Sequence, residues 1–189
     1  MLTSEYENIF KNQVSHWWYK GMASISISLL KRYLPKNKEL KILDAGCGTG
    51  SAMVYLKDFG EVRGIDISDK ALKHAKKFGR VSKDSITKLN FRNNSFDLVV
   101  CFDVMYHSSV DQYEKAISEF NRVLKKEGIL LMREPAFNWL ISSHDLAAFT
   151  KKRFTKEEIE ESIKKNSFNI LKITYLNFFL FPLVLVKRI

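Results

Sequence analysis

The chain has 189 residues, which is enough for one domain and too few for two separate hydrophobic cores. Hydrophobic residues make up 46% of it and charged residues 28%, a balance typical of chains that fold and not of disordered ones. The formal net charge of +10 favours acidic partners such as nucleic acid, anionic lipid or phosphorylated metabolites, without choosing among them.

The two cysteines, Cys47 and Cys101, stand apart from each other and from any paired motif. The sequence therefore lacks the ligands of a zinc ribbon, an iron–sulfur cluster or a disulfide scaffold, and we expect no bound metal. The N-terminal residues carry no signal-peptide pattern, and no apolar run reaches the ~20 residues that span a bilayer. We expect a protein of a reducing, cytoplasmic setting.

Residues 1–37 are predicted to form an amphipathic helical leader that packs on the core and stops at Pro35. Residues 38–189 are expected to form the main unit, so that the chain is a single structural domain overall. Within this unit, short apolar runs alternate with helical stretches in the order KILDAG, SAMVYLKDFG, VRGIDIS, DKALKHAKKFG, FDLVVCF, DQYEKAISEFNRVLKKEG and GILLMREPA. Such alternation predicts an α/β fold with a doubly wound, mainly parallel sheet, because parallel neighbours require long crossover connections.

The C-terminal part of the chain is predicted to hold a helix followed by strands. After a loop from Phe137 to Arg153, Thr155 and Glu158 have the spacing of a capping box, which predicts a helix that runs to about Asn166. The apolar segment over residues 169–189 predicts one or two closing strands.

Three of the eight glycines fall in the segment GCGTG, residues 46–50, directly after an apolar strand. Glycine at the point where a strand leads into a helix lets the backbone come close to a ligand and permits positive φ. Since a simple turn rarely needs three glycines, this loop is expected to hold a ligand.

The residues around the loop indicate which ligand it suits. The dinucleotide fingerprint requires glycine or alanine at the position of Ser51, and the phosphate loop requires a Gly-Lys-Ser/Thr sequence that does not occur here. Asp44, two residues before the first glycine, would repel a pyrophosphate and would suit a ligand that presents an ammonium group. These residues disfavour an NAD-type oxidoreductase, which we keep as an alternative.

Asp66 ends the second predicted strand, 22 residues after Asp44. A carboxylate at that position can accept hydrogen bonds from both hydroxyls of a ribose, and Ile67 beside it can lie against an adenine ring. The sequence therefore predicts an adenosine-containing ligand.

Four segments, taken in order, resemble the motifs of class I S-adenosylmethionine-dependent methyltransferases, in particular the type 11 group with its quinone-biosynthesis-like members. They are ILDAGCGTG, GIDIS, LNFRNNSFDLVVCFDVMYH and FNRVLKKEGILLMREPA, and the resemblance spans Lys41 to Ala136. It implies a Rossmann-like fold, S-adenosylmethionine as cofactor, and methyl transfer to a small-molecule or lipid-like acceptor at oxygen, carbon or nitrogen. A non-catalytic adaptor that keeps the cofactor pocket is the other alternative.

The resemblance also implies a set of cofactor-binding positions. Asp44 and the glycine backbone would surround the methionine moiety, Asp66 would hold the ribose, and Ile67 and Ile86 would sandwich adenine. Ser85 stands where relatives carry an acid, so weaker adenine anchoring is expected. The full set is Asp44, Gly46, Cys47, Gly48, Asp66, Ile67, Ser85, Ile86 and Cys101.

His107 follows the strand FDLVV and is the candidate general base, because the pKa of a histidine lies near neutrality. The alternative is a structural role, in which the His107 ring caps or packs the loop. Asp103 is likewise expected to have a structural role, in which its side chain bonds the loop backbone. The segment Val104–His107 lacks the Asp/Asn-Pro-Pro-Tyr/Phe pattern of enzymes that methylate nucleic-acid bases, which disfavours that reaction.

The acceptor-pocket candidates are Tyr19, Tyr106, His144 and Arg153. A structural salt bridge is the alternative role for Arg153. At least one of the adjacent rings of Trp17, Trp18 and Tyr19 should cover ligand or solvent, and one of the tryptophans is expected to pack in the core.

The stretch Lys70–Arg92 holds eight basic residues and one acid. Its helical part has apolar residues on one face and lysines on the other, with few aromatics between them, so a solvated surface is expected and nucleic acid is not. The apolar run Phe178–Val186 is expected to be a core strand, with peripheral membrane contact as the alternative. The oligomeric state is left open.

Overall fold

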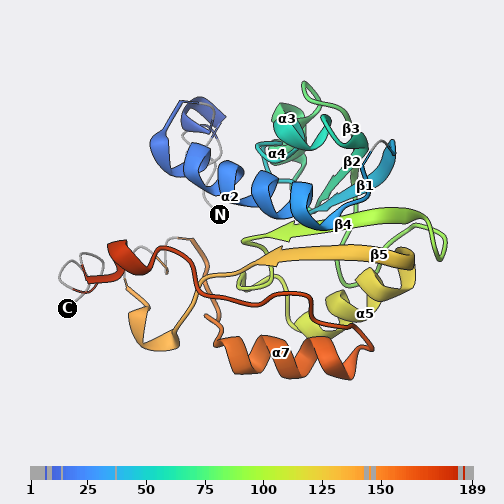
Figure 1. Cartoon of the computed structure of the whole chain (residues 1–189). Helices are drawn as coiled ribbons and strands as arrows, with labels where there is room; N and C mark the ends of the chain where they lie inside the picture. Colours follow the sequence, from blue (N-terminus) through green and yellow to red (C-terminus); the bar gives the residue numbers. More distant parts are fainter. Residues whose placement is uncertain are drawn as a thin grey trace.

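The computed structural model describes residues 7, 10–13, 15–36, 38–142, 145, 148–182 and 185 (Figure 1). Its strands form one parallel sheet in the order β3-β2-β1-β4-β5. They are β1 (Leu40–Ala45), β2 (Gly60–Asp66), β3 (Arg80–Lys83), β4 (Phe96–Phe102) and β5 (Leu124–Arg133). The order reverses between β1 and β4, and open α/β sheets bind their ligands at the carboxyl ends of the strands beside such a reversal.

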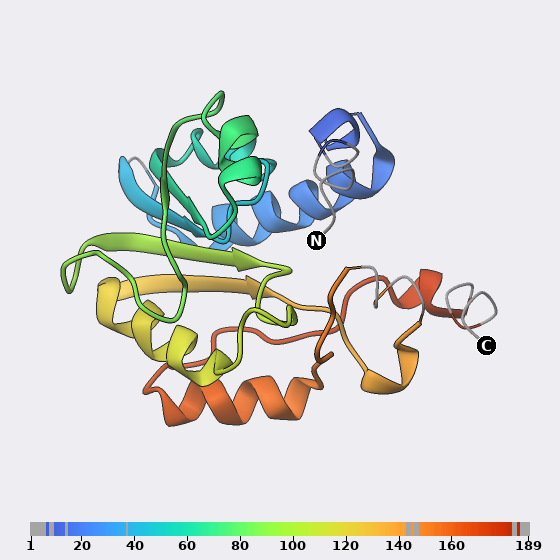
Figure 2. The ribbon, with the colours of Figure 1, turned by 180° about the vertical axis from the view of Figure 1, so that it is seen from behind.

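Helices cover both faces of the sheet (Figures 1 and 2). One face carries α2 (Trp17–Tyr33), α3 (Met53–Leu56) and α4 (Asp69–Ala75), and the other carries α5 (Tyr113–Val123) and α7 (Lys156–Lys165). Two short 3-10 helices, η1 (Asn138–Leu140) and η2 (Phe178–Leu180), lie beyond the sheet. The predicted α/β fold with a doubly wound parallel sheet is confirmed.

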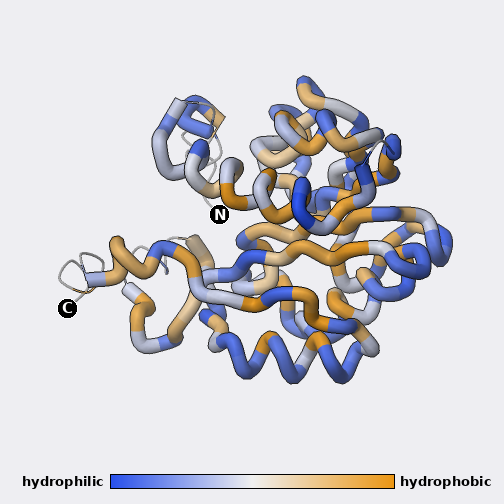
Figure 3. Tube along the Cα trace, viewed as in Figure 1, coloured by the Kyte–Doolittle hydropathy of each residue, from blue (hydrophilic) through white to orange (hydrophobic). Residues whose placement is uncertain are grey.

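The two halves of the core follow from the alternation of side chains along β1. Ile42 packs with Leu30 and Leu56 on the α2 side, whereas Leu43 packs with Phe120 on the α5 side. Both β1 residues have 0% exposure, because successive side chains of a strand point to opposite faces and both faces are covered here. In Figure 3 hydrophobic residues accordingly follow the strands, while α7 alternates between hydrophobic and hydrophilic turns.

Local caps begin the helices where the sequence places them. Ser68 precedes α4 and its hydroxyl accepts the Ala71 N–H at 3.3 Å. The predicted capping box before α7 is confirmed, since Glu158 N–H donates to the Thr155 hydroxyl and Thr155 N–H donates to the Glu158 carboxylate at 2.8 Å.

The leader helix α2 packs its C-terminal half on the sheet through Leu30, and Leu34, the residue that follows the end of the helix, packs there too. Gly21 lies nearer its start, and a β-carbon added there would meet no described residue within 4 Å. We expect Gly21→Ala to raise the free energy of unfolding by about 0.5 to 1 kcal/mol, because it removes backbone freedom from the unfolded chain without a clash. Denaturant titration checks this. Ala23→Gly in the same helix should lower stability by a similar amount, and a loss from both substitutions would contradict the expectation.

Two predicted elements differ in the structure. The helix predicted over residues 111–128 ends at Val123, and Leu124 already pairs with Phe96 as the first residue of β5. The closing strands predicted over residues 169–189 are wrong for the described residues 169–182, which contain none. There Asn177 takes a left-handed conformation with φ 64° and is followed by η2, so the apolar run coils instead of extending along β5.

Candidate active site

The glycine loop turns sharply after β1 and is tied to β2. The N–H groups of Gly46 and Cys47 both donate to the Ile65 carbonyl at 2.8 Å. Gly46 has a φ of 82°, and a β-carbon there would lie 2.4 Å from a methyl of Val104, so only glycine fits. Gly48 has a φ of 54°, and a β-carbon at Gly48 would meet nothing within 4 Å among the described residues. The backbone of Gly48 therefore faces open space that a ligand can approach.

Asp66 turns its side chain towards this loop from the end of β2. Its carboxylate accepts the Gly48 N–H at 2.9 Å and the Ser68 N–H at 2.8 Å. Burial raises the pKa of Asp66, and the hydrogen bonds from the backbone oppose this increase. Both carboxylate oxygens keep lone pairs with which they can accept ribose hydroxyls.

Asp44, the penultimate residue of β1, is a buried acid without a complete set of partners. Its residue exposure is 2%, and Oδ2 has no hydrogen-bond partner among the described residues. Burial, and secondarily the charge of Asp66, raise the pKa of Asp44 to about 7. A buried acceptor oxygen left without a donor costs free energy. A cationic ligand beside the glycine loop would supply that donor. An adenosine-containing ligand that carries an ammonium group is such a ligand.

A contact between the leader and the glycine loop was not predicted from the sequence. The Thr49 hydroxyl donates to Oε1 of Gln13 at 2.6 Å, and both residues are buried. Nε2 of Gln13 is also buried, with no hydrogen-bond partner among the described residues. Gln13 thus adds a second unsatisfied polar atom next to the loop, and no local pattern could have identified a single glutamine in a helical leader.

The adenine-side candidates have different environments. Ile67 is 49% exposed beside Asp66, as a residue that covers a ligand would be, whereas Ile86 is 5% exposed and belongs to the core on the α5 side. The Ser85 hydroxyl lies 2.9 Å from the Thr87 hydroxyl and accepts the Thr87 N–H, so it has partners already. Contact of Ser85 and Ile86 with adenine stays a prediction.

The loop after β4 is held by Glu134, a residue that sequence reasoning missed. The Glu134 carboxylate accepts the N–H groups of Val104, Met105 and Tyr106 at 2.9 to 3.2 Å. Burial, and secondarily the charge of Asp103, raise the pKa of Glu134. The only available signal was an acid directly after a strand and before a proline. Glu134 therefore fixes the backbone that carries the acceptor-side candidates.

Among the described residues, the Asp103 carboxylate bonds an arginine side chain and not the loop backbone that was expected. Its carboxylate accepts from the Arg133 guanidinium, with a shortest distance of 2.5 Å, and that guanidinium also stacks over the Phe102 ring. The two cysteines are buried free thiols, and burial raises the pKa of both. Cys101 has 0% exposure and packs in the α5-side core, whereas Cys47 packs on the α2 side.

His107 is half-buried, and its ring is oriented by Ser109. The Ser109 N–H donates to Nδ1 at 3.1 Å. A neutral imidazole whose Nδ1 accepts an N–H carries its own proton on Nε2, so Nε2 donates and does not accept. Burial lowers the pKa of His107, and the charge of Asp66 opposes this decrease. The neutral ring is therefore arranged as a hydrogen-bond donor at pH 7.

We expect His107→Gln to lower methyl-transfer turnover by less than about tenfold, because a glutamine side-chain N–H can replace the donor. Steady-state rates over a range of pH check this. Removal of a general base instead costs about 100- to 10,000-fold and removes a limb of the pH profile. A loss of that size in the His107 variant would show that His107 is the general base. Ser109→Ala, which leaves the backbone donor in place, is the matched control.

Arg153 forms the structural salt bridge that was its alternative role. Its guanidinium donates to the Asp145 carboxylate at 2.6 and 3.0 Å and to the Ala136 carbonyl at 3.1 Å. The two charged side chains are only 11% and 5% exposed. The pair ties the 137–153 loop together, and a substrate role for Arg153 would require it to exchange these partners.

The other acceptor-side candidates lie on two segments. The Tyr106 carbonyl accepts the Lys151 N–H at 2.8 Å, which joins the loop after β4 to the 137–153 loop. Tyr19 is partly buried on α2, and His144 lies outside the described residues. Trp17 and Trp18 are 62% and 39% exposed, so the expected core packing of one of them is wrong and both rings face outward.

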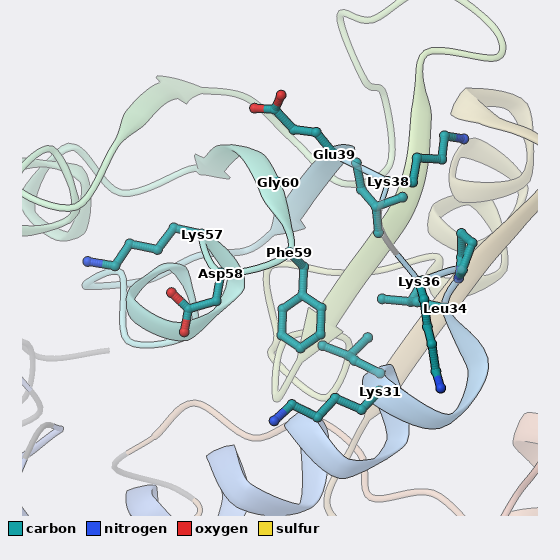
Figure 4. A pocket seen from close by; sticks show the side chains of 12 residues that line it. Lys31, Leu34, Lys36, Lys38, Glu39, Lys57, Asp58, Phe59 and Gly60 are labelled. Atoms are coloured by element: carbon teal, nitrogen blue, oxygen red, sulfur yellow. The ribbon is translucent and has the colours of Figure 1, made fainter.

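Two surface hollows lie at the opposite edge of the sheet, where the strands begin. The hollow in Figure 4 has a volume of about 670 Å³ and lies between the end of α2 and the starts of β1 and β2. Its charged residues are Lys31, Lys36, Lys38, Glu39, Lys57 and Asp58. The neighbouring hollow shares Lys38 and also borders Asp97, whose carboxylate is already bonded by Lys38 and Lys125. Neither hollow borders the glycine loop.

The basic helix α4 and the lengths of the helices bear on two further expectations. On α4 Ala71, Leu72 and Ala75 are buried while Lys73 and the following Lys76 are exposed, so the predicted solvated face is confirmed. Within the described ranges, no helix is both long and apolar enough to cross a lipid bilayer.

The sequence of this chain is similar to those of known methyltransferases. A family model described as a methyltransferase domain matches residues 43–132. An uncharacterized protein of Methanocaldococcus jannaschii is 39% identical over 106 residues, which are 56% of this chain and 45% of that protein. The ubiquinone/menaquinone biosynthesis C-methyltransferase UbiE of Campylobacter jejuni is 37% identical over 109 residues, 51% of this chain and 45% of that protein. The chain thus spans about half the length of these curated relatives.

Among solved structures, phosphoethanolamine N-methyltransferase 2 of Haemonchus contortus in complex with S-adenosyl-L-methionine superposes with a TM-score of 0.74. It is 25% identical, and the match covers 98% of this chain and 45% of that one. The matched region of the family model begins in β1 and includes the glycine loop and Asp66 on this parallel sheet. These matches support a class I S-adenosylmethionine-dependent methyltransferase with S-adenosylmethionine as its cofactor.

Proposed function

We propose that this chain catalyses methyl transfer from S-adenosylmethionine to a small-molecule or lipid-like acceptor. The observation that supports this most directly is the buried Asp44 oxygen, which finds no donor in the described part of the chain and lies next to a glycine loop that is open at Gly48 and bonded to Asp66. An acid that needs a cation and an acid that can accept ribose hydroxyls then flank the same loop. A pyrophosphate-containing dinucleotide would place like charges together there.

The cofactor, when bound, supplies an electrophilic methyl group. Asp44 and Gln13 would hold its amino-acid end, the former accepting from the ammonium group and the latter donating to the carboxylate. Asp66 would hold the ribose. The loop fixed by Glu134 would position the acceptor, and the surrounding segments would exclude water. Alignment of donor and acceptor would supply most of the rate enhancement, since the displacement itself needs little further chemistry.

The acceptor atom is proposed to be oxygen, carbon or nitrogen of a small or lipid-like molecule and not a nucleic-acid base. The sequence Val104–His107 and the scarcity of aromatics on the basic α4 face support this exclusion. A strong base is not built into the loop, because the tautomer fixed by Ser109 makes His107 a donor. An acceptor that arrives as a ready nucleophile, or that loses its proton to water, suits such a site.

We also propose that residues 1–37 and 38–189 act as one structural unit in a cytoplasmic setting. The contact between Thr49 and Gln13 and the packing of Leu30 support a leader that belongs to the cofactor site. The two buried free thiols suit a reducing compartment.

The experiment is calorimetric titration with S-adenosylmethionine, followed by incubation of the protein with a cell extract and isotopically labelled methyl donor. We expect saturable cofactor binding and one labelled class of small or lipid-soluble product in mass spectrometry. Binding without any labelled product would indicate a non-catalytic adaptor. Stabilisation by a nicotinamide dinucleotide without binding of S-adenosylmethionine would indicate the oxidoreductase alternative.

A further inference from the structure

Large aromatic side chains are exposed at the end of the molecule towards which the strands point. Trp17 and Trp18 start α2, Trp139 lies in η1, and Phe178 and Phe179 lie in η2; we call these five residues the aromatic rim. In Figures 1 and 2 the start of α2 and the η2 segment both lie on the side to which the β4 and β5 arrows point. This is the side of the sheet that carries the glycine loop.

The aromatic side chains of the rim are largely exposed to solvent. Phe179 is 91% exposed, Phe178 is 77% exposed, and the three tryptophans of the chain are 39% to 62% exposed. Phe181 joins Trp139 to Phe137, with ring centroids 6.1 Å apart in each pair, so the C-terminal half of the rim has a packed aromatic base. Large apolar side chains that are exposed in groups like these are typical of binding surfaces.

We propose that the aromatic rim inserts into the surface of a lipid bilayer with anionic headgroups, which turns the methyl-transfer site towards the membrane. The benefit of membrane contact rests on the proposed function, because a lipid-soluble acceptor could then reach the methyl-transfer site without crossing water. Binding of the aromatic rim to vesicles can be measured without any methyl transfer.

Three observations favour a bilayer over a protein partner. Tryptophan is the residue type enriched at membrane–water interfaces, and here every tryptophan of the chain lies in the rim. Exposed Lys11 and Lys20 flank the leader tryptophans, and the chain has a formal net charge of +10, which complements anionic headgroups. The rim also belongs to two separate segments of the fold, which suits a soft surface better than one flat protein interface.

The test uses the intrinsic tryptophan fluorescence of the full chain, because all its tryptophans report from the rim. Vesicles of phosphatidylcholine alone and of equal parts phosphatidylcholine and phosphatidylglycerol are titrated in, and co-sedimentation measures the partition. We expect a shift of the emission to shorter wavelength with the anionic vesicles and weaker partition at high salt. Phe178→Ser with Phe179→Ser should weaken partition by at least about tenfold, since each removes an inserting ring.

Leu171→Ser is the matched control, because Leu171 is 61% exposed but lies early in the segment that returns from α7, before the rim. It should leave partition unchanged. Absence of binding by the unchanged chain, or an equal loss in the Leu171 variant, overturns the proposal. An emission shift that depends on protein concentration without vesicles also overturns it, in favour of a second copy of the chain. Cofactor calorimetry without vesicles separates this result from a failure of the proposed function.

Discussion

Replacement of Asp66 by alanine is expected to weaken S-adenosylmethionine binding by about 1.5 to 3 kcal/mol, or roughly 10- to 150-fold. The carboxylate is the group at the end of β2 that can accept both ribose hydroxyls, and charge-assisted hydrogen bonds have this strength. The substitution also removes the acceptor of the Gly48 N–H, so the glycine loop loses one of its ties to β2. Calorimetric titration of the purified chain measures the change.

The control for this prediction is Asp58→Ala. Asp58 is exposed at the opposite edge of the sheet, where it borders the hollow of Figure 4, and its loss changes the net charge by the same amount. Cofactor affinity should be unchanged in that variant. An affinity equal to that of the unchanged chain in the Asp66 variant, with normal thermal unfolding, would contradict the ribose assignment.

Asp44 is expected to make cofactor binding depend on pH. Without ligand its pKa is raised from 3.8 to about 7 by burial and by Asp66, so the carboxyl group is protonated below pH 7. A cation favours the ionised form. Binding should therefore release a proton below pH 7, and affinity should rise by up to about tenfold per pH unit towards pH 7 and then level off. Calorimetry in buffers of different ionisation enthalpy counts the protons released.

The Asp44 carboxyl group also makes the free energy of unfolding depend on pH, and this contribution falls as pH rises, whereas cofactor affinity increases. Between pH 3.8 and about 7 the folded chain holds a proton on Asp44 that the unfolded chain has lost. This contribution to stability is complete below pH 3.8 and is lost as pH rises through 7, by up to about 1.4 kcal/mol per pH unit.

Asp44→Asn is expected to remove both pH dependences. Above pH 7 it should weaken cofactor binding by roughly 10- to 150-fold, because the ligand loses a charged partner. Asp58→Asn, an exposed acid far from the loop, should change neither binding nor its pH dependence. Proton release that persists in the Asp44 variant would show that another group titrates on binding.

Local pattern was sufficient to predict the layered fold and the place of two acids, Asp44 and Asp66, at one edge of the sheet. Strand β4 begins and ends where FDLVVCF does, and α7 begins at its capping box, because side-chain alternation and end-capping depend on residues a few positions apart. The two acids could be placed there because Asp44 is the penultimate residue of a parallel strand and Asp66 is the last residue of the next, and parallel strands share their carboxyl edge.

The sequence by itself thus determined the alternation of strands and helices, the position of the glycine loop and the class of cofactor. The tertiary structure decided which side chains meet over long separations: Gln13 with Thr49, Glu134 with the N–H groups of 104–106, and Arg153 with Asp145. It also decided that Trp17 and Phe179 are exposed instead of buried. Periodicity records which residues are apolar, but the partner of a buried polar group, and whether an apolar residue finds a neighbour, depend on how distant segments pack.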